Sequence, residues 1–173
     1  AKFQEWSDEM TLDNGYTAGA GPRILYEVNG EFNDWTYGDT LSKPKAYTWT
    51  PEVGTPADGF WPPQSRIVPL ARELLRACWV LAQCGGGWLK VQDVQIVEGA
   101  LNAGHAAHLS VLARNVGAKP TTGPVTATLS ALDAGTEVLS GGIEYPAVPS
   151  LANASAAGGA TFWVAAADTV PPG

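Results

Sequence analysis

Hydrophobic and polar residues follow different periods in the two halves of the chain. In the first half, apolar residues between Ser65 and Gln83 recur three and four positions apart, which is the spacing of one buried helix face. The members of this stripe are Ile67, Leu70, Ala71, Leu74, Leu75, Cys78, Leu81 and Ala82. We therefore expect a helix over 65–83, with Ser65 as its N-cap and Pro69 in the first turn, where a missing N–H is harmless.

Shorter elements are expected upstream of this helix. Residues 2–10 have the pattern of a helix end, and the Asn14-Gly15 pair marks where that helix stops. Residues 24–28 are a short apolar segment before a second Asn-Gly turn. Residues 46–50 are rich in Tyr, Trp and Thr, a composition that favours a strand.

The second half alternates apolar and polar residues instead. This alternation predicts strands over 89–96, 108–113, 125–129 and 161–164, separated by Gly, Asn and Pro. Short strands with regular turn signals are typical of an immunoglobulin-like β-sandwich. Because the strand count is low and the chain ends in Pro-Pro-Gly, we expect the sandwich to be incomplete at its C-terminus.

A run of three glycines separates the two patterns. We therefore expect a first domain over 1–84, a linker over 85–87 and a β-sandwich over 88–173. The two cysteines, Cys78 and Cys84, are not spaced as metal ligands, and Cys78 falls at a core position of the predicted helix.

Charge and hydropathy exclude some partners. The formal net charge is −7, and the basic residues are scattered, which argues against a nucleic-acid or anionic-membrane surface. No apolar run approaches the length of a membrane span.

Few residues present candidate chemistry on local pattern alone. Glu52 follows the predicted strand 46–50, where a carboxylate is either aimed into a site or faces solvent. Tyr26 is either a hydrogen-bond donor or a core aromatic. His105 and His108 are three residues apart in a strand-like segment, so they are expected to point to opposite faces and to form no metal site.

The first half resembles the carboxypeptidase A/T family of zinc metallocarboxypeptidases. The matching motifs are ILYEVNGEFNDWTYG at 24–38, YTWTPEVG at 47–54 and GFWPP at 59–63, in that order. The helix over 65–83 then resembles the last helix of the family. The resemblance implies an α/β fold with a mixed sheet, of which this chain would hold the C-terminal portion.

The resemblance also implies roles for individual residues. Glu52 matches the catalytic glutamate, which removes a proton from a zinc-bound water and delivers it to the leaving amine. Tyr26 matches the mobile tyrosine that closes over the C-terminus of the substrate. Asn33 falls where the family sets its specificity, and Thr50 and Phe60 match further residues that line the site.

The sequence departs from the family in its metal ligands. The family's H-x-x-E pair, its later His and its substrate-binding arginines lie upstream of the tyrosine loop, and residues 1–23 cannot supply them. We therefore expect a fragment of a zinc-dependent carboxypeptidase that cleaves C-terminal residues from peptides and proteins. Its zinc ligands would lie in a missing N-terminal part, and the fragment alone would be inactive.

The second half bears on location and on an alternative function. Residues 109–117 resemble accessory modules of secreted bacterial members of the family, which implies a secreted, periplasmic or cell-surface protein. The alternative is a non-catalytic module that binds carbohydrate or protein, built on a degenerate peptidase scaffold. An upstream H-x-x-E and a later His would support the enzyme, and their absence would support the alternative.

Overall fold

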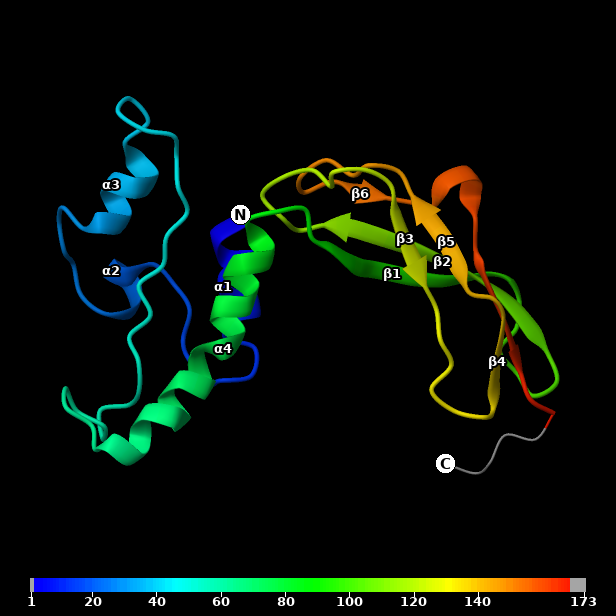
Figure 1. The fold of residues 1–173 in the computed structure, drawn as a ribbon, viewed down its shortest axis with the longest axis horizontal. Helices are drawn as coiled ribbons and strands as arrows, with labels where there is room; N and C mark the ends of the chain where they lie inside the picture. The colour runs from blue at the N-terminus through cyan, green and yellow to red at the C-terminus, as the bar shows by residue number, and fades with distance from the viewer. Residues whose placement is uncertain (1, 169–173) are drawn as a thin grey trace. The chain divides into compact units, whose positions relative to one another are not determined.

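The computed structural model describes residues 2–168 and combines short helices with antiparallel strands (Figure 1). The chain forms two compact units, Ala1–Ala82 and Gln83–Gly173. The described part of the first unit is helical and irregular, whereas the strands found within residues 2–168 all lie in the second unit. None of the helices within residues 2–168 is both long and apolar enough to cross a membrane.

The first unit is built from helices that long irregular segments connect. In chain order they are α1 (Lys2–Met10), α2 (Gly21–Ile24), α3 (Phe32–Gly38), the 3₁₀ turn η1 (Gln64–Arg66) and α4 (Ile67–Cys84). The helix predicted over 2–10 is confirmed as α1. Arg76 of α4 ties the two longest helices together, because its Nε donates to the Glu9 carbonyl at 2.7 Å and its Nη2 lies 2.5 Å from the Glu9 carboxylate.

The strand predicted over 46–50 is wrong. These residues are extended, but they pair with no other strand, and residues 24–28 form the end of α2 and an irregular segment. A strand needs a neighbour for its backbone hydrogen bonds, and the described part of the first unit offers none. Helix α3 provides a hydrogen-bond partner instead, since the Ala46 N–H donates to the Thr36 carbonyl at 3.0 Å.

An aromatic cluster holds the extended segment against α1. The Phe3 ring lies 5.1 Å from the rings of Tyr47 and Trp49, and Trp6 lies 5.0 Å from Tyr47, in edge-on arrangements. Trp6 is almost fully buried. Alternate side chains of 46–50 therefore pack as a strand's would, although the backbone forms no ladder.

Helix α4 begins later than predicted and turns a different face inward. It starts at Ile67 after the 3₁₀ turn, so Ser65 lies in that turn and is not the N-cap. The predicted buried stripe is largely exposed: Ile67 and Leu75 are both 60% accessible, and Cys78 is exposed. The face toward the rest of the unit carries buried Val80, together with Glu73 and Arg76, whose side chains bond to Tyr16 and to the Glu9 carbonyl of α1.

The second unit contains two antiparallel sheets. The larger runs in the order β1 (Leu89–Gly99), β2 (Ala106–Asn115), β7 (Phe162–Ala166) and β4 (Thr136–Ser140), and β6 (Asn153–Ala154) also pairs with β2. The smaller pairs β3 (Val125–Thr128) with β5 (Gly142–Tyr145), and a 3₁₀ turn, η2 (Ala157–Gly159), precedes β7. The predicted strands form β1, β2, β3 and β7. Strands β4, β5 and β6 were not predicted, because the Gly- and Ala-rich sequence around them hides their alternation.

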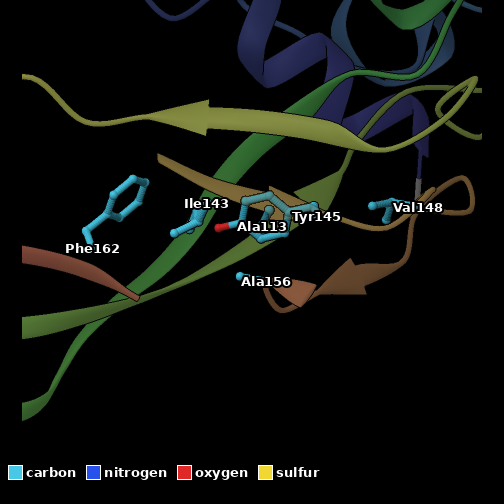
Figure 2. Close-up of a cluster of buried hydrophobic side chains, with 6 residues drawn as sticks. All are labelled: Ala113, Ile143, Tyr145, Val148, Ala156 and Phe162. Carbon is cyan, nitrogen blue, oxygen red and sulfur yellow. The ribbon is translucent and has the colours of Figure 1, made fainter. Parts of the chain in front are cut away.

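Both sheets contribute to one apolar core, which Figure 2 shows. Four of its buried members lie on strands: Ala113 on β2, Ile143 and Tyr145 on β5, and Phe162 on β7. The other two, Val148 and Ala156, lie in the connections between strands. The Tyr145 hydroxyl donates to the Val111 carbonyl of β2 at 2.8 Å, so one side chain bridges the two sheets. The second unit therefore has an apolar core of its own, to which both sheets contribute.

A fully buried asparagine ends β2. The Asn115 Oδ1 accepts the N–H groups of Trp88 and Gly117, and its Nδ2 donates to the carbonyls of Lys119 and Val148. All four distances are between 2.9 and 3.0 Å. The sequence analysis gave asparagine only as one of the residue types that separate strands, whereas the structure makes Asn115 the polar centre of this end of the unit.

Candidate functional site

The structure brings two of the predicted site residues together. Asn33 lies in the first half of α3, and Thr50 ends the extended segment. The Asn33 Nδ2 donates to the Thr50 Oγ1 at 2.8 Å, although the residues are 17 positions apart. The proposed specificity residue and a proposed lining residue therefore form one polar pair.

The residues just before Glu52 are held by two helices. Buried Thr36 of α3 shares a hydrogen bond of 2.7 Å with the Thr48 hydroxyl. The Trp49 indole N–H donates to the Ser7 hydroxyl of α1 at 2.9 Å. Together with the Asn33–Thr50 bond, these contacts fix the backbone that leads into Glu52.

Glu52 itself has a free carboxylate. It lies in an irregular loop, its side chain is exposed, and it makes no hydrogen bond or ion pair with any residue in 2–168. A carboxylate without a partner keeps all of its lone pairs for a ligand or a water molecule.

The backbone just after Glu52 is tied to α4 through a tyrosine. The Gly54 N–H donates to the Tyr16 hydroxyl at 2.8 Å, and that hydroxyl donates to the Glu73 carboxylate at 2.8 Å. Gly54 has a φ of +90°, and a Cβ there would lie 3.1 Å from Asp58 and 3.3 Å from Leu70, so the position requires glycine. Burial is the main cause that raises the pKa of the Tyr16 phenol.

An ion pair closes the same loop. The Arg66 Nε donates to the Asp58 carboxylate at 2.6 Å, and the Arg66 Nη2 reaches Glu73 at 3.4 Å. Asp58 also accepts the Thr55 N–H at 2.9 Å. The Arg66 guanidinium, followed by the Thr55 N–H, holds the pKa of the Asp58 carboxyl well below its usual range.

The two remaining predicted residues form no hydrogen bond with Glu52 among the described residues. Tyr26 is 70% exposed in the segment after α2, and the Phe60 side chain is fully exposed. Neither forms a ring contact or hydrogen bond within residues 2–168. Sequence reasoning also missed Tyr16 and Glu73, because a contact between residues 57 positions apart leaves no local pattern.

The described residues do not fit a zinc ion. A zinc site needs at least three protein ligands, and no group of three His, Cys, Asp or Glu side chains within residues 2–168 could hold a metal. His105 lies in the turn before β2 and not on the strand, with its ring near the Ala103 carbonyl. His108 contacts the Thr161 hydroxyl at 3.0 Å and stacks on Trp163.

Comparison with known proteins connects this site to a family. Residues 2–77 match the family model described as zinc carboxypeptidase, a range that contains every predicted site residue. Neither a search of the curated proteins nor a search of the solved structures finds a match. Residues 2–77 are therefore similar to the zinc carboxypeptidases, which confirms the resemblance that the sequence motifs indicated.

Proposed function

We propose that the first unit is the C-terminal part of a zinc-dependent carboxypeptidase domain. The zinc ligands would come from a segment of the same polypeptide outside residues 1–173. The family match over 2–77 supports this proposal. The observation that carries it is the unpaired Glu52 carboxylate, which lies in a loop anchored on both sides, at the position that the resemblance assigns to the catalytic glutamate.

Glu52 would act as a general base and then as a general acid. An unpaired, exposed carboxylate can accept a proton from a water molecule as that water attacks the C-terminal peptide bond. The same carboxyl group can then donate the proton to the leaving amine. Hydrogen bonds at Thr50 and Gly54 hold the backbone on either side of Glu52, which limits the region that its carboxylate can reach.

The other candidates would bind substrate. Tyr26 is exposed and has no partner within residues 2–168, so its phenol is free to move onto the C-terminus of a bound peptide. The Asn33–Thr50 pair offers hydrogen bonds but no charge to the last side chain of that peptide. The substrates would be C-termini of peptides and proteins, and a secreted, periplasmic or cell-surface location would suit them.

The test removes the proposed base in the full-length polypeptide. Because Glu52→Gln keeps the shape but cannot take a proton, turnover of a peptide substrate should fall by about 10²–10⁴-fold. Glu31→Gln, at another exposed carboxylate before α3, is the matched control and should keep wild-type turnover. Near-full activity of Glu52→Gln would refute the assignment. A full-length protein that binds peptide or carbohydrate without cleaving any peptide would favour the non-catalytic alternative.

A further inference from the structure

The loop that carries Glu52 depends on a tyrosine and a glutamate to which the sequence assigns no role. Tyr16 lies in the irregular segment between α1 and α2, and Glu73 lies in α4. The Tyr16 hydroxyl lies 2.8 Å from both the Gly54 nitrogen and the Glu73 carboxylate. One phenol therefore connects the Glu52 loop to the longest helix of the unit.

The direction of these hydrogen bonds follows from their chemistry. An ionised carboxylate can only accept, so Tyr16 donates its single proton to Glu73. The lone pairs of the phenol oxygen then remain for the Gly54 N–H, which can only donate. The carboxylate and the backbone N–H thus orient the hydroxyl from both sides, and such chains of hydrogen bonds strengthen one another.

Glu73, which accepts the Tyr16 hydroxyl, has further hydrogen-bond partners. Its carboxylate also accepts a hydrogen bond from the Arg66 guanidinium, and its backbone carbonyl accepts one from the Asn14 side-chain amide at 2.9 Å. Asn14 stands two residues before Tyr16, and its Oδ1 accepts the Tyr16 N–H at 3.0 Å. Both ends of the tyrosine are therefore tied to the same turn of α4.

Together with the Asn33–Thr50 bond, this chain brackets Glu52. One anchor lies two residues before the glutamate, at Thr50, and the other lies two residues after it, at Gly54. Such a short stretch with both ends held has few backbone conformations, so the point from which the Glu52 side chain leaves the backbone depends on the anchors.

We propose that Tyr16, supported by Glu73, is a positioning residue that fixes the backbone at Gly54 and so aims the Glu52 carboxylate. This inference rests on the proposed role of Glu52. It predicts that Tyr16 affects the chemical step more than substrate binding, because Tyr16 contacts the base's loop through the backbone and is half-buried.

The test compares Tyr16→Phe with Tyr37→Phe in the full-length polypeptide. Both variants remove one phenol oxygen from the first unit, but Tyr37 has only ring and cation contacts among the described residues. We expect hydrogen exchange at the Gly54 amide to become about tenfold faster in Tyr16→Phe and to stay unchanged in Tyr37→Phe. We also expect kcat to fall about tenfold in Tyr16→Phe, with KM nearly unchanged.

Two substitutions of Glu73 separate positioning from general stability. Glu73→Gln retains an oxygen that accepts the Tyr16 hydroxyl, so kcat and Gly54 exchange should stay close to wild type. Glu73→Leu removes the acceptor and should reproduce the Tyr16→Phe values. A role in folding alone would instead lower the melting temperature and leave kcat per folded molecule unchanged.

The outcomes distinguish this inference from the proposed function. If Glu52→Gln abolishes turnover while Tyr16→Phe changes neither kcat nor Gly54 exchange, the positioning role is wrong and the function stands. If Glu52→Gln has no effect, or the polypeptide cleaves no peptide, the proposed function fails. Faster Gly54 exchange in Tyr16→Phe would then still show that Tyr16 holds this loop, but not that it aims a catalytic base.

Discussion

The two units of this chain differ in how they bury their large apolar side chains. In the second unit, side chains from both sheets meet in a core, and Ile143 and Phe162 are each only 4% exposed. In the first unit, large apolar side chains of α4 stay outside, with Trp79 62% exposed. Both units leave some apolar side chains exposed, including Val91 and Ile96 of β1 in the second unit. The second unit nevertheless buries a core to which both of its sheets contribute, whereas the first leaves a face of α4 without cover among residues 2–168.

The difference extends to the backbone. The second unit satisfies its N–H and carbonyl groups in antiparallel ladders that many residues share. The irregular segments of the first unit depend on single side chains, such as Tyr16 for Gly54 and Asn33 for Thr50. A ladder keeps its backbone hydrogen bonds when one side chain is removed, whereas a loop held by a single side chain loses its hydrogen bond. Removing an anchoring side chain in the first unit should therefore loosen one loop, and removing a core side chain in the second unit should lower the free energy of unfolding of the whole unit.

The largest expected contrast is in the melting of residues 1–173 expressed alone. Each Å² of apolar surface that stays exposed loses about 25 cal/mol of stabilisation that burial would give. This loss is large because the free energy of unfolding of a whole domain is only about 5–15 kcal/mol. We expect the second unit to melt cooperatively and the first to lose its helices gradually at lower temperature, with binding of a hydrophobic dye. Circular dichroism and hydrogen exchange would measure this. A single sharp transition with protected amides in α1 and α4 would contradict it.

The next effect tests the core of the second unit. Phe162→Ala should lower the free energy of unfolding by about 3–5 kcal/mol, because it leaves a cavity between the sheets. Trp163→Ala is the matched control: its ring is 42% exposed and stacks on His108 outside the core. That change should cost only about 1 kcal/mol. Urea unfolding of both variants measures the difference, and equal losses would show that the core lies elsewhere.

A somewhat smaller effect is expected from the buried asparagine. Asn115→Ala removes four hydrogen bonds and leaves buried backbone groups without partners, so it should cost about 3 kcal/mol. Asn102→Ala, in the exposed turn before β2, should change the free energy of unfolding by less than about 0.5 kcal/mol. Thermal unfolding of the two variants would compare them, and a neutral Asn115→Ala would contradict the buried network.

The smallest effect is a pH dependence of the Glu52 loop. The pKa of Asp58 is lowered in the folded protein, chiefly by Arg66, so its contribution is complete above its unfolded pKa of about 3.9. That contribution is lost as the pH falls through the lower folded pKa. Protection of the Thr55 amide, corrected for intrinsic exchange, should therefore decrease below about pH 4 in the full-length polypeptide. Asp58→Asn should show weaker protection at neutral pH and little further loss in acid.

Local pattern was sufficient for the elements whose geometry depends on their own residues. Alternation predicted β1, β2, β3 and β7, and the pattern of residues 2–10 predicted α1. The ordered motifs over 24–63 indicated the zinc carboxypeptidase resemblance, which the family match over 2–77 confirms. The roles of Glu52, Tyr26, Asn33, Thr50 and Phe60 stay predictions.

Tertiary structure alone decided which surfaces and backbone groups meet. The 46–50 segment has strand composition but no neighbouring strand, so it packs on α1 and α3 instead. The period of α4 predicted a helix, yet the inward face carries Glu73 and Arg76, which are not members of the predicted apolar stripe. The Tyr16 anchor joins residues 57 positions apart. Periodicity reports the shape of one element, whereas burial and hydrogen bonding depend on what lies opposite, and that partner is often distant in the sequence.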